Sequence, residues 1–170
     1  MRGGPFGRPD IAGPGLESTS WGSLFPRVGV DVEAKSVDAS TDSACRAAQS
    51  LERALVAAQV AADNRGRDVV VLDMRELTPI FDYFVLATGT SRRQLHAISE
   101  EIDHTLEQGM GDRRLGIEGY QESRWILLDY GDVVVHLFDA ETRQYYSIED
   151  LWAQAKRVPF EPRPSRPAAK

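Results

Sequence analysis

The chain has 170 residues, of which 42% are apolar, and a net charge of −6 at pH 7. This length and composition suit one globular domain with a buried core and additional tails. It contains no run of about 18 apolar residues, so we expect no transmembrane helix. The start of the chain lacks a secretory signal pattern, and the single cysteine, Cys45, cannot form an internal disulfide, so we expect a reducing, cytoplasmic location.

Composition divides the chain into three segments. Residues 1–42 are rich in glycine and proline and show no regular period, which predicts a disordered N-terminal extension. Residues 43–158 carry 13 basic and 19 acidic residues and form the predicted domain, and residues 159–170 form a predicted disordered tail with proline and arginine. An acidic domain repels a phosphate backbone, so we expect a basic protein surface, and not nucleic acid, as the main partner.

The predicted domain begins with a helix from Ser43. Small and aliphatic residues recur at spacings of three and four and form one stripe: Ala44, Ala48, Leu51, Leu55, Ala58 and Ala62. Asn64-Arg65-Gly66 is a typical helix end. Two short apolar runs, residues 68–74 and 82–88, then predict buried strands.

A second helix is predicted after Gly89-Thr90-Ser91. Ser91 and Gln94 have the spacing of a capping box, in which two side chains satisfy free backbone amides at a helix start. Its buried stripe consists of Leu95, Ile98, Ile102 and Leu106. A polar segment with a possible short strand at residues 116–118 follows.

The most apolar stretch, residues 125–138, predicts a β-hairpin. Its two arms flank Asp129-Tyr130-Gly131-Asp132, where Gly131 can adopt a positive φ and the aspartates favour a tight reversal. Residues 139–143 predict a turn, 145–146 a short edge strand, and 147–152 a short helix. The order of elements predicts a single compact α/β domain with a mixed β-sheet flanked by helices. Because a helix lies between residues 88 and 125, the second and third strands are predicted to be parallel neighbours.

The two faces of the hairpin suggest a binding surface. Strict alternation places Trp125, Leu127 and Asp129 on one side of the first arm, and Val134, His136 and Phe138 on one side of the second. An aromatic anchor beside a carboxylate is typical of a protein interface. The alternative is a sealed core that contains a buried tryptophan and a buried histidine, and the pattern leaves both possibilities open.

Catalysis is the competing hypothesis. Gly89-Thr90-Ser91 at a strand-to-helix turn is where nucleotidyltransferase folds hold a phosphate, but such enzymes also need a pair of carboxylates that binds metal ions. Glu100, Glu101 and Asp103 lie along a helix beyond its buried stripe, and His96 and His104 are eight residues apart. We therefore predict neither a metal nor another cofactor, and no catalytic residue.

Several motifs, taken in order, resemble the ribosomal silencing factors, also called the Iojap family. They are Asp82-Tyr83-Phe84-Val85, Ala87 to Gln94, Gly116-Ile117-Glu118-Gly119, Trp125 to His136, Arg143-Gln144-Tyr145-Tyr146 and Leu151-Trp152. The resemblance covers about residues 45–155. It implies a nucleotidyltransferase-like α/β topology without the catalytic carboxylates, and a protein that is not an enzyme.

The resemblance also implies a partner and a mechanism. Members of the family bind the large ribosomal subunit through ribosomal protein L-fourteen, block joining of the small subunit, repress translation during nutrient limitation, and are often homodimers. The hairpin motif of the family corresponds here to Trp125, Asp129 and Asp132, and Tyr130, His136 and Tyr145 lie in the same block. These six residues form the predicted partner-binding site.

Overall fold

The structure is a computed structural model that describes residues 39–163, with side-chain environments from residue 43 onward. The predictions for residues 1–38 and 164–170 lie outside the described residues. The elements are α1 (Ala39–Asp63), β1 (Arg67–Asp73), β2 (Tyr83–Gly89), α2 (Arg92–Met110), β3 (Gly116–Glu118), β4 (Trp125–Asp129), β5 (Val133–Asp139), α3 (Ala140–Tyr146), α4 (Ile148–Leu151) and β6 (Lys156–Val158). None of the helices in this range is long and apolar enough to cross a bilayer.

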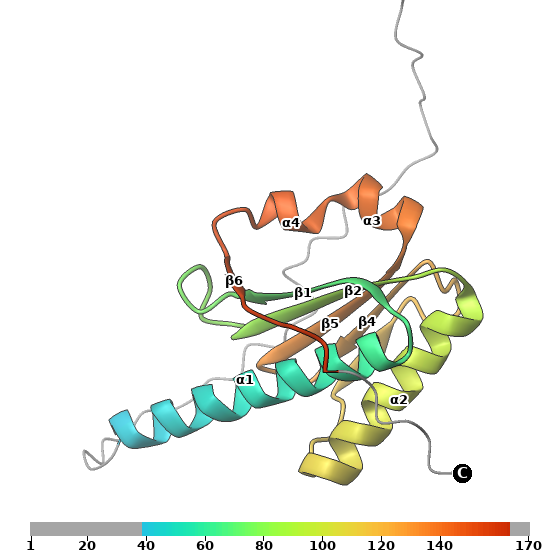
Figure 1. Ribbon diagram of the computed structural model, residues 1–170. Coiled ribbons are helices and arrows are strands. Elements are labelled where there is room, and N and C mark those ends of the chain that lie inside the picture. Colours follow the sequence, from blue (N-terminus) through green and yellow to red (C-terminus); the bar gives the residue numbers. More distant parts are fainter. Residues whose placement is uncertain (1–38, 164–170) are drawn as a thin grey trace, which may run out of the picture. The chain divides into compact units, whose positions relative to one another are not determined.

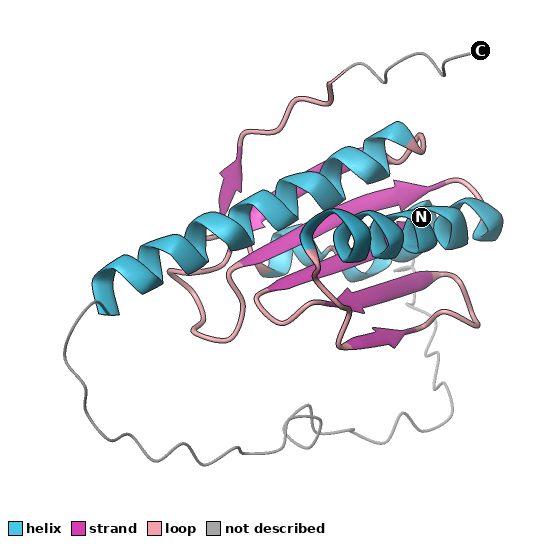
Figure 2. Ribbon diagram, turned by 90° about the horizontal axis from the view of Figure 1, so that it is seen from below, coloured by secondary structure: helices cyan, strands magenta, loops and turns pink. Residues whose placement is uncertain are grey.

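One mixed six-stranded sheet organises the domain, in the order β3-β4-β5-β2-β1-β6. Helices cover both faces: α1 and α2 lie on one side, and the short α3 and α4 lie on the other (Figure 1). Figure 2 shows the sheet from the side that α1 and α2 cover, with both helices in front of the strands. The mixed α/β sheet domain predicted from the sequence is therefore confirmed.

Two cores follow from the alternation of side chains along the strands. The first core lies between the sheet and α1 and α2, and the small residues of α1, such as Ala57 and Ala61, let that helix approach the strands closely. The second core lies between the sheet and α3 and α4, where Ile148 and Trp152 pack against Leu72, Phe84 and Phe138. The hairpin supplies residues to both cores.

The predicted parallel pairing of the second and third strands is wrong. The parallel partner of β2 is β5, with Val85 opposite Val135, whereas β4 pairs with β5 antiparallel and does not touch β2 in the sheet. Burial explains the order: every residue from Val133 to Phe138 is buried, whereas β4 alternates between buried and half-buried residues. A strand that is apolar on both faces takes a central place in the sheet.

The region after the hairpin also differs from the prediction. Residues 140–146 form the helix α3, not a turn followed by an edge strand. Asp139 caps it, because its side chain accepts a hydrogen bond from the Thr142 amide (2.7 Å). The short helix predicted at 147–152 is present as α4.

Both ends of the described domain extend further than the predicted domain. Helix α1 begins at Ala39, and a strand absent from the prediction, β6, pairs with β1. Beyond β6, Phe160 packs against the first core, and the Arg163 backbone exchanges hydrogen bonds with the Gln59 side chain (3.0 and 3.2 Å).

Candidate partner-binding surface

The side chains of the hairpin separate into the two faces that alternation predicts. Ile126, Leu128, Val133, Val135 and Leu137 belong to the first core. Trp125, Leu127, Val134 and Phe138 belong to the second core. The candidate site is therefore the second face, where the cover provided by α3 and α4 is incomplete.

Five aromatic side chains form a continuous cluster on this face, which we call the aromatic cluster: Phe138, His136, Trp125, Tyr146 and Tyr145. The ring of Trp125 lies 5.1 Å from that of Phe138 and 5.0 Å from that of Tyr146, and Tyr145 packs edge-on against Tyr146 at 5.0 Å. Phe138 is fully buried, Trp125 is half-buried, Tyr146 is 50% exposed, and Tyr145 is 80% exposed. The cluster thus runs from the interior to the solvent.

His136 lies at the buried end of the aromatic cluster. It is only 5% exposed, and its Nδ1 accepts a hydrogen bond from the Trp125 indole Nε1 (3.3 Å). Burial lowers the pKa of His136 to about 4, so the ring is neutral at physiological pH. The sequence left open whether this histidine lies in the core or on an exposed face, and the structure places it in the core.

Backbone contacts hold Trp125 in place from the preceding loop. Gly119 has a φ of +69°, and a Cβ there would lie 1.9 Å from the Trp125 carbonyl oxygen, so only glycine fits. His96 of α2 stacks on Tyr120 at 4.1 Å and hydrogen-bonds the Ser123 hydroxyl (2.6 Å), which fixes this loop to α2. These contacts also assign His96 a structural role.

The short α3–α4 segment is fastened to the sheet by Arg143. Its guanidinium donates to the Thr88 hydroxyl on β2 (2.7 Å) and to the Glu149 carboxylate on α4 (3.0 Å). Burial alone would raise the pKa of Glu149, but the hydrogen bonds and charge of Arg143 hold it below its ordinary value. This contact fixes the helix that carries Tyr145 and Tyr146.

The hairpin turn lies at the other end of β4 and does not join the aromatic cluster. Trp125 and Asp129 are the first and last residues of β4, about 13 Å apart at the usual rise of about 3.3 Å per residue. The Asp129 carboxylate accepts from the Gly131 amide (2.7 Å), and Gly131 has the positive φ that the turn requires. Asp129 is therefore engaged within its own turn.

Tyr130 and Asp132 are tied to the helices of the first core. Tyr130 is 4% exposed, its hydroxyl donates to Asp103 on α2 (2.6 Å), and burial raises its pKa. The Asp132 carboxylate faces Ser50 (3.4 Å) and Arg53 (3.6 Å) on α1. The six predicted residues therefore form two groups: Trp125, His136 and Tyr145 meet in the aromatic cluster, and the three turn residues do not.

Two exposed side chains of the α3–α4 segment, Tyr146 and Leu151, are absent from the six predicted site residues. Tyr146 was assigned to an edge strand, although its place next to Tyr145 in the sequence could have indicated an aromatic pair on a helix. Leu151 of α4 is 70% exposed, and the motif Leu151-Trp152 marked its position in the sequence but not its exposure.

The glycine turn offers little to a nucleotide. The Thr90 amide donates to the Gln94 side chain (2.7 Å), and the Gln94 amide donates to the Ser91 hydroxyl (3.2 Å), so these donors are already used. Among the described residues, no group of three or more histidine, cysteine, aspartate or glutamate side chains is placed to hold a metal ion. The turn acts as a helix cap.

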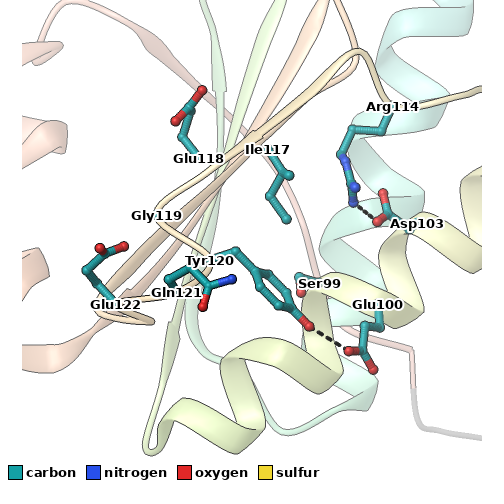
Figure 3. A pocket seen from close by; sticks show the side chains of 10 residues that line it. All are labelled: Ser99, Glu100, Asp103, Arg114, Ile117, Glu118, Gly119, Tyr120, Gln121 and Glu122. Carbon is teal, nitrogen blue, oxygen red and sulfur yellow. Dashed lines mark hydrogen bonds and ion pairs between the residues drawn. The ribbon is translucent and has the colours of Figure 1, made fainter.

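A surface pocket of about 530 Å³ lies between α2 and the β3 edge (Figure 3). Four of its ten lining residues are acidic, and two of these have protein partners: Glu100 accepts from the Tyr120 hydroxyl (2.7 Å) and Asp103 pairs with Arg114. Because Glu100 and Asp103 already have protein partners, neither carboxylate is left unpaired for a ligand.

Comparisons with known proteins agree with this fold. A crystal structure of a Chromobacterium violaceum protein matches with a TM-score of 0.59 and 34% identity, and covers 70% of this chain and 98% of that one. The ribosomal silencing factor RsfS of Bacillus subtilis is 42% identical over 101 residues, which span 59% of this chain and 84% of that protein. The chloroplastic protein Iojap of Arabidopsis thaliana is 36% identical over 116 residues, which span 67% of this chain and 48% of that protein.

The fold and these relatives define a class of ribosome-associated α/β domains that regulate translation. The family model described as "Ribosomal silencing factor during starvation" matches residues 47–170. The chain belongs to the ribosomal silencing factor family, as its motifs indicated.

Proposed function

We propose that this protein binds the large ribosomal subunit through ribosomal protein L-fourteen and sterically blocks joining of the small subunit, which represses translation when nutrients are limiting. The observation that carries the proposal is the exposed end of the aromatic cluster, where Tyr145 and Tyr146 project beside the half-buried Trp125. Aromatic side chains of this kind supply most of the binding energy in protein interfaces.

Charge supports the same kind of partner. Ribosomal proteins that bind RNA are basic, and residues 43–158 of this chain carry an excess of acidic residues. Opposite charges steer association and set orientation, while the aromatic anchor provides affinity. A protein that acts by exclusion needs no turnover, so the proposal requires no catalytic group.

We further propose that the protein is cytoplasmic and forms a homodimer. Analytical ultracentrifugation of the full chain tests whether it is a dimer.

Truncation of Trp125 tests the docking surface. We expect Trp125→Ala to weaken binding to purified large subunits by about 2 kcal/mol or more, because it removes an anchor at the centre of the surface. Co-sedimentation with separate large and small subunits measures this loss. Leu115→Ala is the matched control, because Leu115 is an exposed large apolar residue whose amide donates to the Asp129 carbonyl, at the opposite end of β4 from Trp125. Equal pelleting of wild type and Trp125→Ala with the large subunit would contradict the proposal.

A further inference from the structure

The hydrogen bond between Trp125 and His136 fixes one form of the histidine. An indole N–H can only donate, so the His136 Nδ1 atom must accept, and the ring proton of the neutral imidazole then lies on Nε2. That Nε2 atom is buried and has no hydrogen-bond partner among the described residues. The ring is therefore held in one neutral tautomer by a single polar contact.

This arrangement is costly for a residue that only fills space. The rings around His136 are Phe84 (4.9 Å), Trp125 (5.9 Å) and Phe138 (6.0 Å), so an aliphatic or phenyl side chain would pack there without an unpaired N–H group. Unlike such a side chain, the histidine has an atom, Nδ1, that accepts a hydrogen bond from the Trp125 indole N–H. Local features that cost stability without a packing benefit commonly serve function.

The strand register explains why position 136 suits this task. Trp125 lies opposite Phe138, and Leu127 lies opposite His136, so Trp125 and His136 are diagonal neighbours on the same face of the hairpin. Diagonal pairs are within reach of long aromatic side chains. Tyr146 packs on Trp125 from α3, so the indole is held between the strand pair and the helix.

We propose that His136 is a positioning residue for partner binding: it does not touch the partner, but its Nδ1 atom locks the Trp125 indole in the orientation that the partner recognises. This inference rests on the proposed role of Trp125 in docking. A side chain that is already ordered loses less conformational entropy on binding, so the locked indole binds more tightly than a mobile one.

Two variants of the same branched shape test the acceptor. His136→Asn places its Oδ1 where Nδ1 stands, whereas His136→Leu has a methyl group there. The indole N–H resonance of Trp125, assigned in a ¹⁵N–¹H spectrum with Trp125→Phe, reports the hydrogen bond directly. We expect the resonance to move upfield in the leucine variant and to stay near its wild-type position in the asparagine variant.

Binding to large ribosomal subunits should follow the same pattern. We expect roughly a three- to tenfold loss of affinity for His136→Leu, as the loss of one net hydrogen bond predicts, and less than about a twofold loss for His136→Asn. An equal loss in both variants, or an unmoved resonance in the leucine variant, would overturn the proposal. If His136→Leu does not fold, His136→Gln replaces it, because its amide reaches the ε position and not the δ position.

Trp125→Ala separates this inference from the proposed function. If that variant binds large subunits as wild type does, docking through Trp125 is wrong, whatever His136 does. If Trp125→Ala loses binding but the two His136 variants behave alike, docking stands and the positioning role is wrong.

Discussion

At the scale of single residues, the hairpin side chains divide between holding the fold and facing solvent. Tyr130 donates its hydroxyl to Asp103, and His136 accepts from the Trp125 indole, so both buried polar residues make their contacts within the protein. Tyr145 has most of its surface in solvent. A sequence motif that joins these residues therefore mixes buried and exposed side chains, and only the structure separates them.

The burial of His136 predicts a pH-dependent stability. Its pKa is lowered from 6.5 to about 4 in the folded protein, so between these values the unfolded chain binds a proton that the folded chain does not. The contribution of neutral His136 to the free energy of unfolding is therefore fully present above pH 6.5, and it is lost as the pH is lowered toward 4. From pH 7 to pH 5 we expect a loss of about 2 kcal/mol from this residue, measured by urea denaturation.

The control is His136→Leu, which has no group to titrate at this position. Its free energy of unfolding should fall less between pH 7 and pH 5 than that of the wild type. Carboxylates with lowered pKa values, such as Asp73 and Asp139, remain in both proteins, and their contribution is lost at lower pH. Parallel pH profiles for the two proteins would show that His136 is not held neutral.

At the scale of elements, the position of the aromatic cluster depends on residues outside it. The loop before β4 approaches the backbone of Trp125 so closely that Gly119 cannot carry a side chain. Arg143 connects α3, α4 and β2 through Glu149 and Thr88. The surface that we propose as a docking site is thus held by a tight loop on one side and by the partly buried ion pair of Arg143 and Glu149 on the other.

Two glycine substitutions test the importance of this loop. Gly119→Ala should destabilise the protein by about 2 kcal/mol or more, because its φ is positive and its Cβ would overlap the Trp125 carbonyl oxygen. Gly109→Ala is the matched control, because no atom lies within 4 Å of its Cβ position in α2. We expect that substitution to be neutral or to stabilise by about 0.5–1 kcal/mol. Denaturation midpoints measure both, and similar midpoints would contradict the close approach.

At the scale of the whole molecule, the proposed mechanism is steric: the bound protein occupies the surface of the large subunit that the small subunit would contact. The described domain presents one aromatic surface and an acidic exterior, and the sheet with its two helical covers provides a rigid support for them. A protein that blocks joining by steric exclusion must be present at about the same concentration as the large subunits that it blocks.

Inhibition of subunit joining should therefore be stoichiometric. When purified large and small subunits are mixed and joining is followed by light scattering, we expect inhibition to saturate near one copy, or one dimer, per large subunit. Trp125→Ala should shift the curve to higher concentration by about 30-fold, the equivalent of 2 kcal/mol. Full inhibition at a small fraction of the subunit concentration would indicate turnover and would contradict exclusion.

Much of the fold is readable from the sequence because its signals are local. The stripe of α2, the Ser91 cap and the positive φ of Gly131 each depend on a few neighbouring residues, and all three are present in the structure. The pairing of the strands could not be predicted from such local signals. Pairing of β2 with β5 joins residues about 50 positions apart, and it depends on how the whole sheet minimises its exposed apolar surface.

The sequence by itself determined the family, the alternation of the hairpin and the residues with the right chemistry for a protein interface. Only the tertiary structure decided which of those residues can meet a partner. The reason is physical: spacing along a strand fixes the face on which a side chain lies, but its exposure depends on what the distant helices α1 to α4 cover. That cover buries His136 and Tyr130, ties Asp132 to α1 and leaves Tyr145 in solvent.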